Sequence, residues 1–299
     1  MINRSSIKYS LKRILPKAIF SLILFIWREI LLYVVEAIDS IRLKKFTKYH
    51  CVTLTHLGSS FSLFISPSNG FIDKHIFLYG IYEPFIFDLF AKYIRPGMTV
   101  IDVGANIGEH TVYAACLVGN KGSVYSYEPI PRLYKQIHDS VGQNHFESIV
   151  HTKNYALGKE DITEKLHVSK NAGGSSIVHD DDTQDIITVT VKKGDSELLL
   201  LNKVDVVKID VEGYEYEVLL GMKEVLRRDM PLIFIEFSGG AYIAQGKDHG
   251  EKILSFLREG NYSLYDIEND MKKITDTKYF LSLFPYAMKQ TNLLCIHEK

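Results

Sequence analysis

The chain has 299 residues, and its 36 acidic and 35 basic side chains leave a formal net charge of -1. Hydrophobic residues make up 46% and charged residues 24% of the sequence, which is typical of a globular protein with a sizeable core. The charge balance argues against a nucleic-acid partner, because phosphate recognition needs a concentrated basic surface. Cys51, Cys116 and Cys295 lack the spacing of a zinc site or a disulfide framework, so we expect free thiols and a cytoplasmic location.

Residues 1–45 are predicted to form an amphipathic helix. Basic residues precede an apolar run at 18–27, and Arg28 interrupts that run before a second apolar stretch begins. The run is shorter than the roughly 20 apolar residues of a spanning helix, and it lacks the small residues of a signal-peptide cleavage site. The helix therefore either packs on its own domain or a second subunit, or lies in a membrane surface through residues 14–38. A signal anchor is a third interpretation.

Residues 46–96 are predicted to form a small β and α extension that leads into the main domain. Residues 50–72 contain two short runs with strand character, separated by Gly58. From Tyr82 to Ile94 the apolar residues recur at helical spacing. The sequence Arg95-Pro96-Gly97 ends that helix.

Residues 97–299 alternate between strands and helices, which is typical of a doubly wound α/β domain with a parallel sheet. Helices are predicted to begin at Glu109, Pro131, Tyr214 and Gly250. Because the last two strands lie close to the C-terminus, we expect the final strand to run antiparallel to the others. Residues 158–203 interrupt the alternation and are predicted to hold a hairpin-type insertion around the sequence NAGGSSI. Seven strands are predicted, at residues 99–103, 123–128, 149–157, 204–211, 231–237, 263–267 and 292–297.

A glycine-rich loop follows the first of these strands, in the sequence VIDVGANIG at residues 100–108. Glycines at a strand-to-helix turn, here Gly104 and Gly108, let the backbone approach a ligand closely and adopt positive φ. The helix that follows presents free N–H groups to a carboxylate or a phosphate. Asp102 and Asn106 add polar groups that suit a zwitterionic amino acid, with Asp102 available to hold an ammonium group or a water.

The loop does not match the dinucleotide fingerprint, whose third glycine would fall at the position of Glu109. A glutamate there would repel a pyrophosphate. An NAD-dependent oxidoreductase is therefore disfavoured. His110, in the first turn of the following helix, is the histidine expected near the ligand.

Glu128 ends the second predicted strand, between the glycine loop and the helix that begins at Pro131. An acidic side chain at this position of a βαβ unit can accept hydrogen bonds from both ribose hydroxyls of a nucleoside. We therefore expect Glu128 to bind a ribose.

The sequence VVKIDVEGYE places Lys208, Asp210 and Glu212 at alternate positions near the end of a predicted buried strand. Three ionisable side chains on one face of such a strand would be costly in a core, so they indicate a site where the sheet opens. Asp210 and Glu212 can bind a hydroxyl, accept its proton or hold a divalent cation. Alternatively, Lys208 forms a structural ion pair with one of them. Glu236, which ends the next strand, is expected to face the same opening and to bind substrate.

These motifs together resemble the FkbM-type methyltransferases. The resemblance rests on TVIDVGANIGEHT, YEPIPRLY, NYALG, GGSSI, VDVVKIDVEGYEYEVLLGM and IFIEFS, which occur in this order over residues 82–240. It implies a class I (Rossmann-like) methyltransferase fold, S-adenosylmethionine as cofactor, and transfer to an oxygen, often on a sugar or polyketide hydroxyl.

Carried over residue by residue, the resemblance assigns two groups of side chains. The cofactor-binding group consists of Asp102, Gly104, Asn106, Gly108, Glu128 and, beside the adenine, Ala156; Ala105 and His110 are added by their positions in and after the loop. The group at the reacting end consists of Asp210, Glu212 and Glu236, and Lys208 is added as a catalytic residue by its position on the same strand as Asp210. The family usually carries a T-L-D sequence before the K-x-D-x-E-G strand, whereas this chain has VKKGDSELL, with Asp195 as the nearest equivalent.

The sequence thus predicts an enzyme that methylates a hydroxyl on a sugar or polysaccharide precursor. Asp210 or Glu212 is expected either to act as the base or to bind a cation, such as Mg²⁺, that acidifies the hydroxyl; no residue is assigned as a dedicated metal ligand. Methylation at nitrogen or of a lipid-linked substrate is an alternative. A further alternative is a catalytically silent scaffold protein in glycan assembly.

Overall fold

The computed structural model describes residues 49–67, 70–169, 183–238, 248–284 and 290–298. Contacts divide the chain into residues 1–48 and residues 49–299, and only the second unit contains described residues. The predicted N-terminal amphipathic helix and the loop sequence NAGGSSI lie outside the described residues. Within them, no helix is both long enough and apolar enough to cross a membrane.

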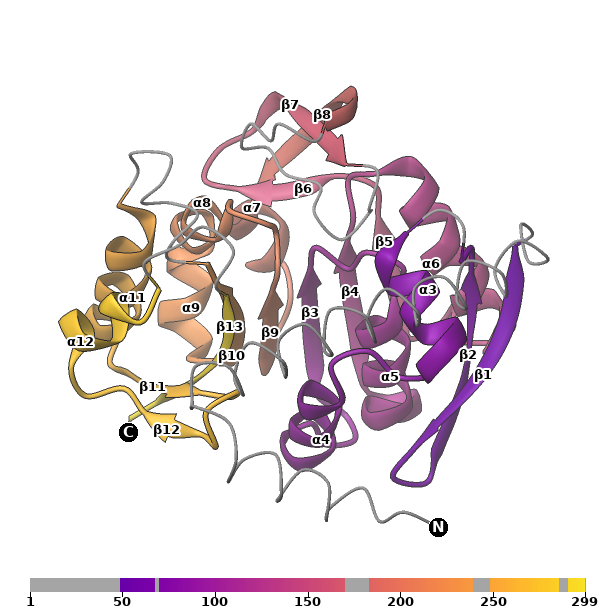
Figure 1. Cartoon of the computed structure of the whole chain (residues 1–299), viewed down its shortest axis with the longest axis horizontal. Coiled ribbons are helices and arrows are strands. Elements are labelled where there is room, and N and C mark those ends of the chain that lie inside the picture. Colours follow the sequence, from indigo (N-terminus) through magenta and orange to yellow (C-terminus); the bar gives the residue numbers. More distant parts are fainter. Residues whose placement is uncertain (1–48, 68–69, 170–182, 239–247, 285–289, 299) are drawn as a thin grey trace, which may run out of the picture. The chain divides into compact units, whose positions relative to one another are not determined.

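The core of the second unit is an eight-stranded sheet in the order β12-β11-β13-β10-β9-β3-β4-β5 (Figure 1). Strands β5, β4, β3, β9 and β10 run parallel, whereas β13 runs antiparallel to both of its neighbours. This order confirms the doubly wound sheet and the antiparallel final strand expected for the class I fold. The strands are β3 (Thr99–Val103), β4 (Ser123–Tyr127), β5 (Val150–Lys153), β9 (Val206–Ile209), β10 (Leu232–Phe237), β11 (Tyr262–Asp266), β12 (Lys272–Lys273) and β13 (Thr291–His297).

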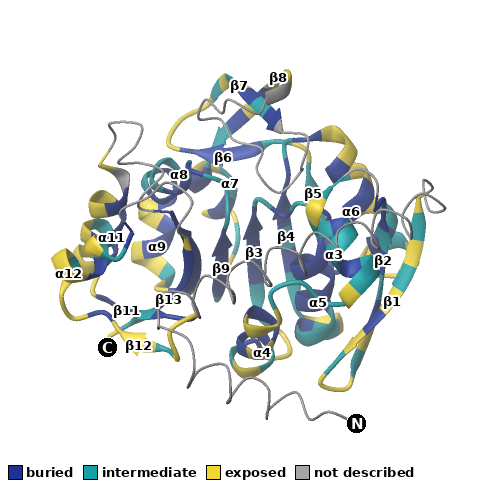
Figure 2. Cartoon of the chain, viewed as in Figure 1, coloured by how far each residue is buried: buried dark blue, intermediate teal, exposed yellow. Residues whose placement is uncertain are grey.

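Helices cover both faces of the sheet, which explains why its central strands are almost continuously apolar and buried (Figure 2). Neighbouring residues of β3 point to opposite faces, so Val100 belongs to one hydrophobic cluster and Ile101 to the other. The described helices are α3 (Phe71–Tyr79), α4 (Pro84–Tyr93), α5 (Glu109–Val118), α6 (Pro131–Gln143), α7 (Gly194–Leu198), α8 (Glu215–Gly221), α9 (Lys223–Asp229), α11 (His249–Glu259) and α12 (Thr277–Ser282).

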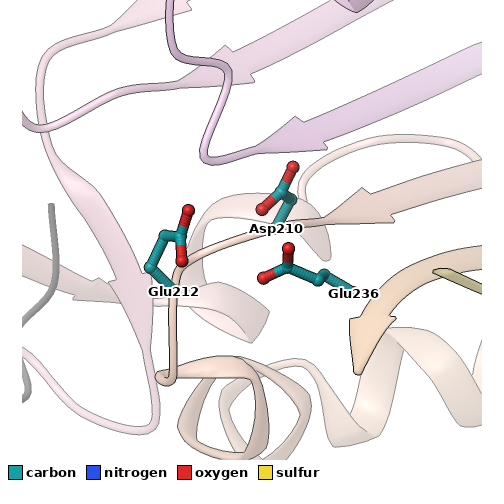
Figure 3. A group of neighbouring side chains, drawn as sticks. All are labelled: Asp210, Glu212 and Glu236. Atoms are coloured by element: carbon teal, nitrogen blue, oxygen red, sulfur yellow. The ribbon is translucent and has the colours of Figure 1, made fainter. Parts of the chain in front are cut away.

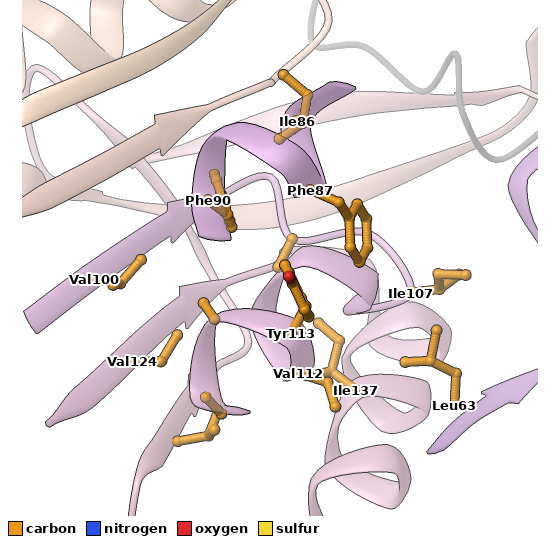
Figure 4. Close-up of a cluster of buried hydrophobic side chains, with 14 of the residues drawn as sticks. Leu63, Ile86, Phe87, Phe90, Val100, Ile107, Val112, Tyr113, Val124 and Ile137 are labelled. Carbon is orange, nitrogen blue, oxygen red and sulfur yellow. The ribbon is translucent and has the colours of Figure 1, made fainter. Parts of the chain in front are cut away.

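The extension before residue 97 packs into the cluster that contains Val100 (Figure 4). Its hairpin consists of β1 (His50–His56) and β2 (Ser59–Ile65), joined by Leu57 and Gly58 in positive-φ conformations. Phe87 of α4 stacks on Tyr113 of α5 with ring centroids 4.6 Å apart. The extension and the sheet therefore share one core, while the domain boundary at residue 97 remains a prediction.

Three expectations about the strands need correction. The predicted strand at residues 149–157 is two strands, because the chain turns after β5 and β6 (Ala156–Gly158) joins a different sheet. In that second sheet β8 (Thr183–Lys193) pairs antiparallel with β7 (Ile162–Ser169) and parallel with β6, so the predicted hairpin gains a third strand. The central sheet also gains an eighth strand, β12, which is two residues long.

Candidate active site

A cavity of about 310 Å³ opens where β3, β4, β9 and β10 reach their carboxyl ends. Its walls come from the glycine loop after β3, the end of β4, the turn after β9 and the segment between α3 and α4. Ligands of doubly wound sheets bind at this edge, because the helices that follow the strands diverge there. Nearly all the side chains that the sequence assigned to a site line this cavity.

The glycine loop requires its two predicted glycines. Gly104 has a φ of +80°, and a Cβ atom there would lie 1.8 Å from the carbonyl oxygen of Asp210. Gly108, with a φ of +87°, precedes α5 and would bring a Cβ atom to 3.0 Å from the side chain of Ile137. Asn106 between them also has a positive φ, of 53°. Both glycines are therefore required by close packing inside the protein, Gly104 against Asp210 and Gly108 against Ile137; Gly104 lines the cavity, whereas Gly108 does not.

Glu128 is fixed against this loop. One of its carboxylate oxygens accepts a hydrogen bond from the backbone N–H of Asn106, and the other accepts one from the backbone N–H of Ile130, each at 2.9 Å. Burial raises the pKa of Glu128 to about 7, although the two backbone donors oppose that shift. Ala156 and Leu157, which are both buried, also line the cavity.

Asp102 does not line the cavity. Its side chain is 2% exposed, and one carboxylate oxygen accepts a hydrogen bond from the Thr111 hydroxyl at 2.5 Å. Burial raises its pKa, and Lys208 and Thr111 oppose that shift. Asp102 therefore holds the first turn of α5 through Thr111, and its charge favours the protonated form of Lys208.

His110 lies in the cavity wall as predicted. Burial and the nearby charge of Lys208 hold its pKa well below the usual value, so its imidazole is neutral near pH 7. Its Nε2 atom lies 3.9 Å from a carboxylate oxygen of Glu83. His110 is therefore placed to contact a ligand without adding positive charge.

Lys208 and Asp210 form a partly buried ion pair at the carboxyl end of β9, with Nζ 2.9 Å from Oδ2. Lys208 is 4% exposed. Burial disfavours its charged form, but Asp210, Asp102 and Glu83 outweigh burial and raise the pKa of Lys208. The pairing that the sequence left open is thus present, and it fixes the orientation of Asp210.

Asp210, Glu212 and Glu236 form what we call the acidic cluster, in which the three carboxylates point toward one another (Figure 3). One oxygen from each lies within 4.8 Å of the others. Burial and the neighbouring Asp210 raise the pKa of both Glu212 and Glu236 well above the usual value. Ionising all three carboxyl groups at once is therefore costly unless a positive charge lies among them.

The backbone that places Glu212 in the cluster differs from the one predicted. Strand β9 ends at Ile209, so Glu212 lies in a turn rather than at the strand end, with a positive φ of 50°. The Glu215 carboxylate holds this turn by accepting hydrogen bonds from the backbone N–H groups of Val211 and Gly213, at 3.2 and 3.0 Å.

Glu83 is a cavity residue that the sequence analysis missed. Its carboxylate accepts a hydrogen bond from the Asn292 side chain at 3.0 Å. Burial, reinforced by the charge of Asp210, raises the pKa of Glu83 to about 7. The only local signal is its position directly before Pro84, at the start of a helix.

Asp195, the nearest equivalent of the family's T-L-D aspartate, does not line the cavity. Its carboxylate accepts hydrogen bonds from the backbone N–H groups of Glu224 and Val225, at 3.1 and 3.0 Å. These donors belong to the first turn of α9, so Asp195 acts as a capping group.

Comparison with known proteins agrees with this geometry. Residues 102–264, more than half of the chain, match the family model described as the methyltransferase FkbM domain. The chain is 30% identical over 141 residues to the hexuronic acid methyltransferase AglP of Haloferax volcanii, covering 46% of this chain and 55% of AglP. It thus spans about half the length of that relative.

Two solved structures are also similar. One is a methyltransferase FkbM from Methylobacillus flagellatus, with 15% identity, coverage of 70% of this chain and 50% of that chain, and a TM-score of 0.43. The other is an S-adenosylmethionine-dependent O-methyltransferase from Thermotoga maritima, with 13% identity, coverage of 84% and 78%, and a TM-score of 0.42. By the match of its sequence, the chain belongs to the FkbM methyltransferase family.

Proposed function

We propose that this chain is an enzyme that uses S-adenosylmethionine to methylate a hydroxyl group of a sugar or polysaccharide precursor. The observation that carries the proposal is the acidic cluster, which lies in the same cavity as the glycine loop and Glu128. Carboxylates bind hydroxyl groups well because they accept their hydrogen bonds. The hexuronic acid named as the substrate of AglP is consistent with a carbohydrate acceptor.

The residues of the cavity fit the cofactor. The loop residues Gly104, Ala105 and Asn106 line the cavity, and Glu128 is positioned to accept hydrogen bonds from the ribose hydroxyls. Ala156 and Leu157 offer an apolar border for the adenine. Asn106, Gly108 and His110 flank the N-terminus of α5, where free N–H groups attract a carboxylate.

For methyl transfer to a hydroxyl, the protein mainly needs to position the two reactants and to remove the hydroxyl proton. S-adenosylmethionine, when bound, would supply a methyl group on its sulfonium sulfur, which would keep the electron pair of the broken sulfur–carbon bond as the acceptor oxygen bonds to the methyl carbon. The acidic cluster would accept the proton of the acceptor hydroxyl. Asp210, oriented by Lys208, and Glu212, whose pKa is raised, are the two candidate acceptors of the proton.

An assay of the purified chain tests the proposal. The chain is incubated with S-adenosylmethionine and, in separate reactions, with sugar nucleotides and oligosaccharides, amines, and lipid-linked sugars. The expected product is a methyl ether on a carbohydrate oxygen, identified by NMR. A product methylated only at nitrogen would contradict the proposal. Tight binding of S-adenosylhomocysteine with no transfer to any acceptor would favour a silent scaffold instead.

A further inference from the structure

We propose that Asp210, Glu212 and Glu236 hold one divalent cation with a preference for oxygen ligands, of the Mg²⁺ or Mn²⁺ type. Three carboxylate oxygens, one from each residue, lie within 4.8 Å of one another (Figure 3). Two oxygens on opposite sides of such a cation are about 4.2 Å apart, and adjacent ones are closer, so small side-chain rotations complete the site. Carboxylates are the protein ligands that these cations prefer.

A second observation points to a ligand at this position. Glu236 is 5% exposed, and its Oε2 atom is buried without a hydrogen-bond partner among the described residues. Buried carboxylates are normally hydrogen-bonded or paired with a charge, because desolvating them is costly. Figure 3 shows the Glu236 carboxylate directed at those of Asp210 and Glu212. A cation between the three would supply the partner that Glu236 lacks.

The net charge of the cluster and its neighbours also favours a bound cation. Lys208 is ion-paired with Asp210 and also faces Asp102 and Glu83. When ionised, the three cluster carboxylates and Lys208 together carry a net charge of -2, since one positive charge stands against three negative ones. One divalent cation balances that charge and relieves the mutual repulsion of the carboxylates.

The backbone holds the three ligands in place. Strands β9 and β10 are parallel neighbours, with Ile209 beside Ile235, so Asp210 and Glu236 extend from adjacent rigid positions. Glu212 is held by its positive-φ turn, which the Glu215 carboxylate braces through the Gly213 N–H. Ligands on rigid elements lose little entropy on binding, which favours a specific site.

The role of this cation in catalysis rests on the proposed hydroxyl transfer, whereas its binding does not. A hydroxyl that coordinates the cation becomes more acidic, and its oxygen is fixed for attack on the methyl carbon. Each ligand offers one oxygen to the cation. The second oxygen of a cluster carboxylate then accepts the hydroxyl proton.

Electron paramagnetic resonance of Mn²⁺ tests the site in the full-length chain after treatment with a chelator. We expect one bound Mn²⁺ per chain, displaced by excess Mg²⁺. Glu236→Gln and Asp210→Asn should each weaken Mn²⁺ binding at least about tenfold. Glu83→Gln is the matched comparison, because it removes a carboxylate of the same cavity that is outside the cluster, and its loss of affinity should be clearly smaller than that of Glu236→Gln. Thermal unfolding verifies that each variant is folded.

Two results would overturn the inference: no Mn²⁺ bound to the folded wild type, or an equal loss of affinity in Glu83→Gln and Glu236→Gln. The second result would indicate a diffuse negative field rather than a site. Failure of the proposed function is distinguishable, because Mn²⁺ binding is measured without an acceptor. If the chain binds Mn²⁺ but methylates no hydroxyl, only the proposed function is contradicted. If methyl transfer is unaffected by a chelator and no Mn²⁺ binds, only the proposed cation site is contradicted.

Discussion

A Cβ atom on Gly104 would lie 1.8 Å from the carbonyl oxygen of Asp210. The backbone of the glycine loop therefore touches the backbone from which the acidic cluster begins. The contact is reinforced one residue earlier, where the Asp210 N–H donates to the carbonyl of Val103 at 3.0 Å. The two halves of the cavity, one that fits the cofactor and one that is acidic, are thus joined by adjacent backbone contacts.

Replacing Gly104 by alanine should therefore displace the backbone in both halves of the cavity and lower the free energy of unfolding. Gly97→Ala is a matched control, because Gly97 has a similar φ of +88° but has no atom within 4 Å of its added Cβ. The control should cost about 1–2 kcal/mol of the free energy of unfolding, from positive φ alone. Gly104→Ala adds a backbone clash, so we expect a loss of more than about 4 kcal/mol. Urea denaturation measures both, and equal losses would show that the loop can move away from Asp210.

The glycine loop and the sheet were predictable because their signals are local. Alternating apolar strands and turn glycines recur within a few residues, so the positions of β3 and β9 and the need for glycine at Gly104 follow from the sequence. Glu83 was not predictable, because its place depends on Asn292, 209 positions further along the chain. The place of Asp102 was not predictable for a related reason: its Thr111 partner lies on the helix after the loop, and Asp102 does not line the cavity. Its role in cofactor binding stays a prediction.

Binding of S-adenosylhomocysteine should depend on pH through Glu128. Its pKa of about 7 means that the carboxyl gains a proton as the pH falls from 8 to 6. The ionised form accepts stronger hydrogen bonds from the ribose hydroxyls. If the bound state keeps Glu128 ionised, the Kd rises about tenfold between pH 8 and pH 6. Isothermal titration calorimetry at several pH values measures this.

Two variants identify the group responsible. Glu128→Gln should bind more weakly at pH 8, by about 1.5–3 kcal/mol, and its Kd should not change with pH over this range. Glu83→Gln should keep the pH dependence, although Glu83 also has a pKa of about 7. If the pH dependence of the Kd instead survives in Glu128→Gln and disappears in Glu83→Gln, the titrating group is Glu83, and the prediction for Glu128 is wrong.

Asp210→Asn should lower turnover far more than cofactor affinity. The substitution keeps the size of the side chain but removes the charge that pairs with Lys208 and faces the acceptor. Loss of proton removal or of a cation ligand costs about 10²–10⁴-fold in kcat. The Kd for S-adenosylhomocysteine should change by less than about threefold, since a neutral sulfur is insensitive to that charge. Equal losses of turnover and of affinity for S-adenosylhomocysteine would make Asp210 a cofactor-binding residue. Asp139→Asn, at an exposed ion pair of α6, serves as the control.

Glu83→Gln should weaken binding of S-adenosylmethionine more than binding of S-adenosylhomocysteine. The two molecules differ in the positive charge on sulfur, and Glu83 lies in the cavity close enough to Asp210 for their charges to interact. Removing one negative charge near a sulfonium in a partly hydrated site costs about 1 kcal/mol, or about fivefold in Kd. Glu268→Gln is the control, because Glu268 contacts the same Asn292 side chain at 3.4 Å but does not line the cavity. Equal weakening of both ligands by Glu83→Gln would instead place Glu83 beside the ammonium group that they share.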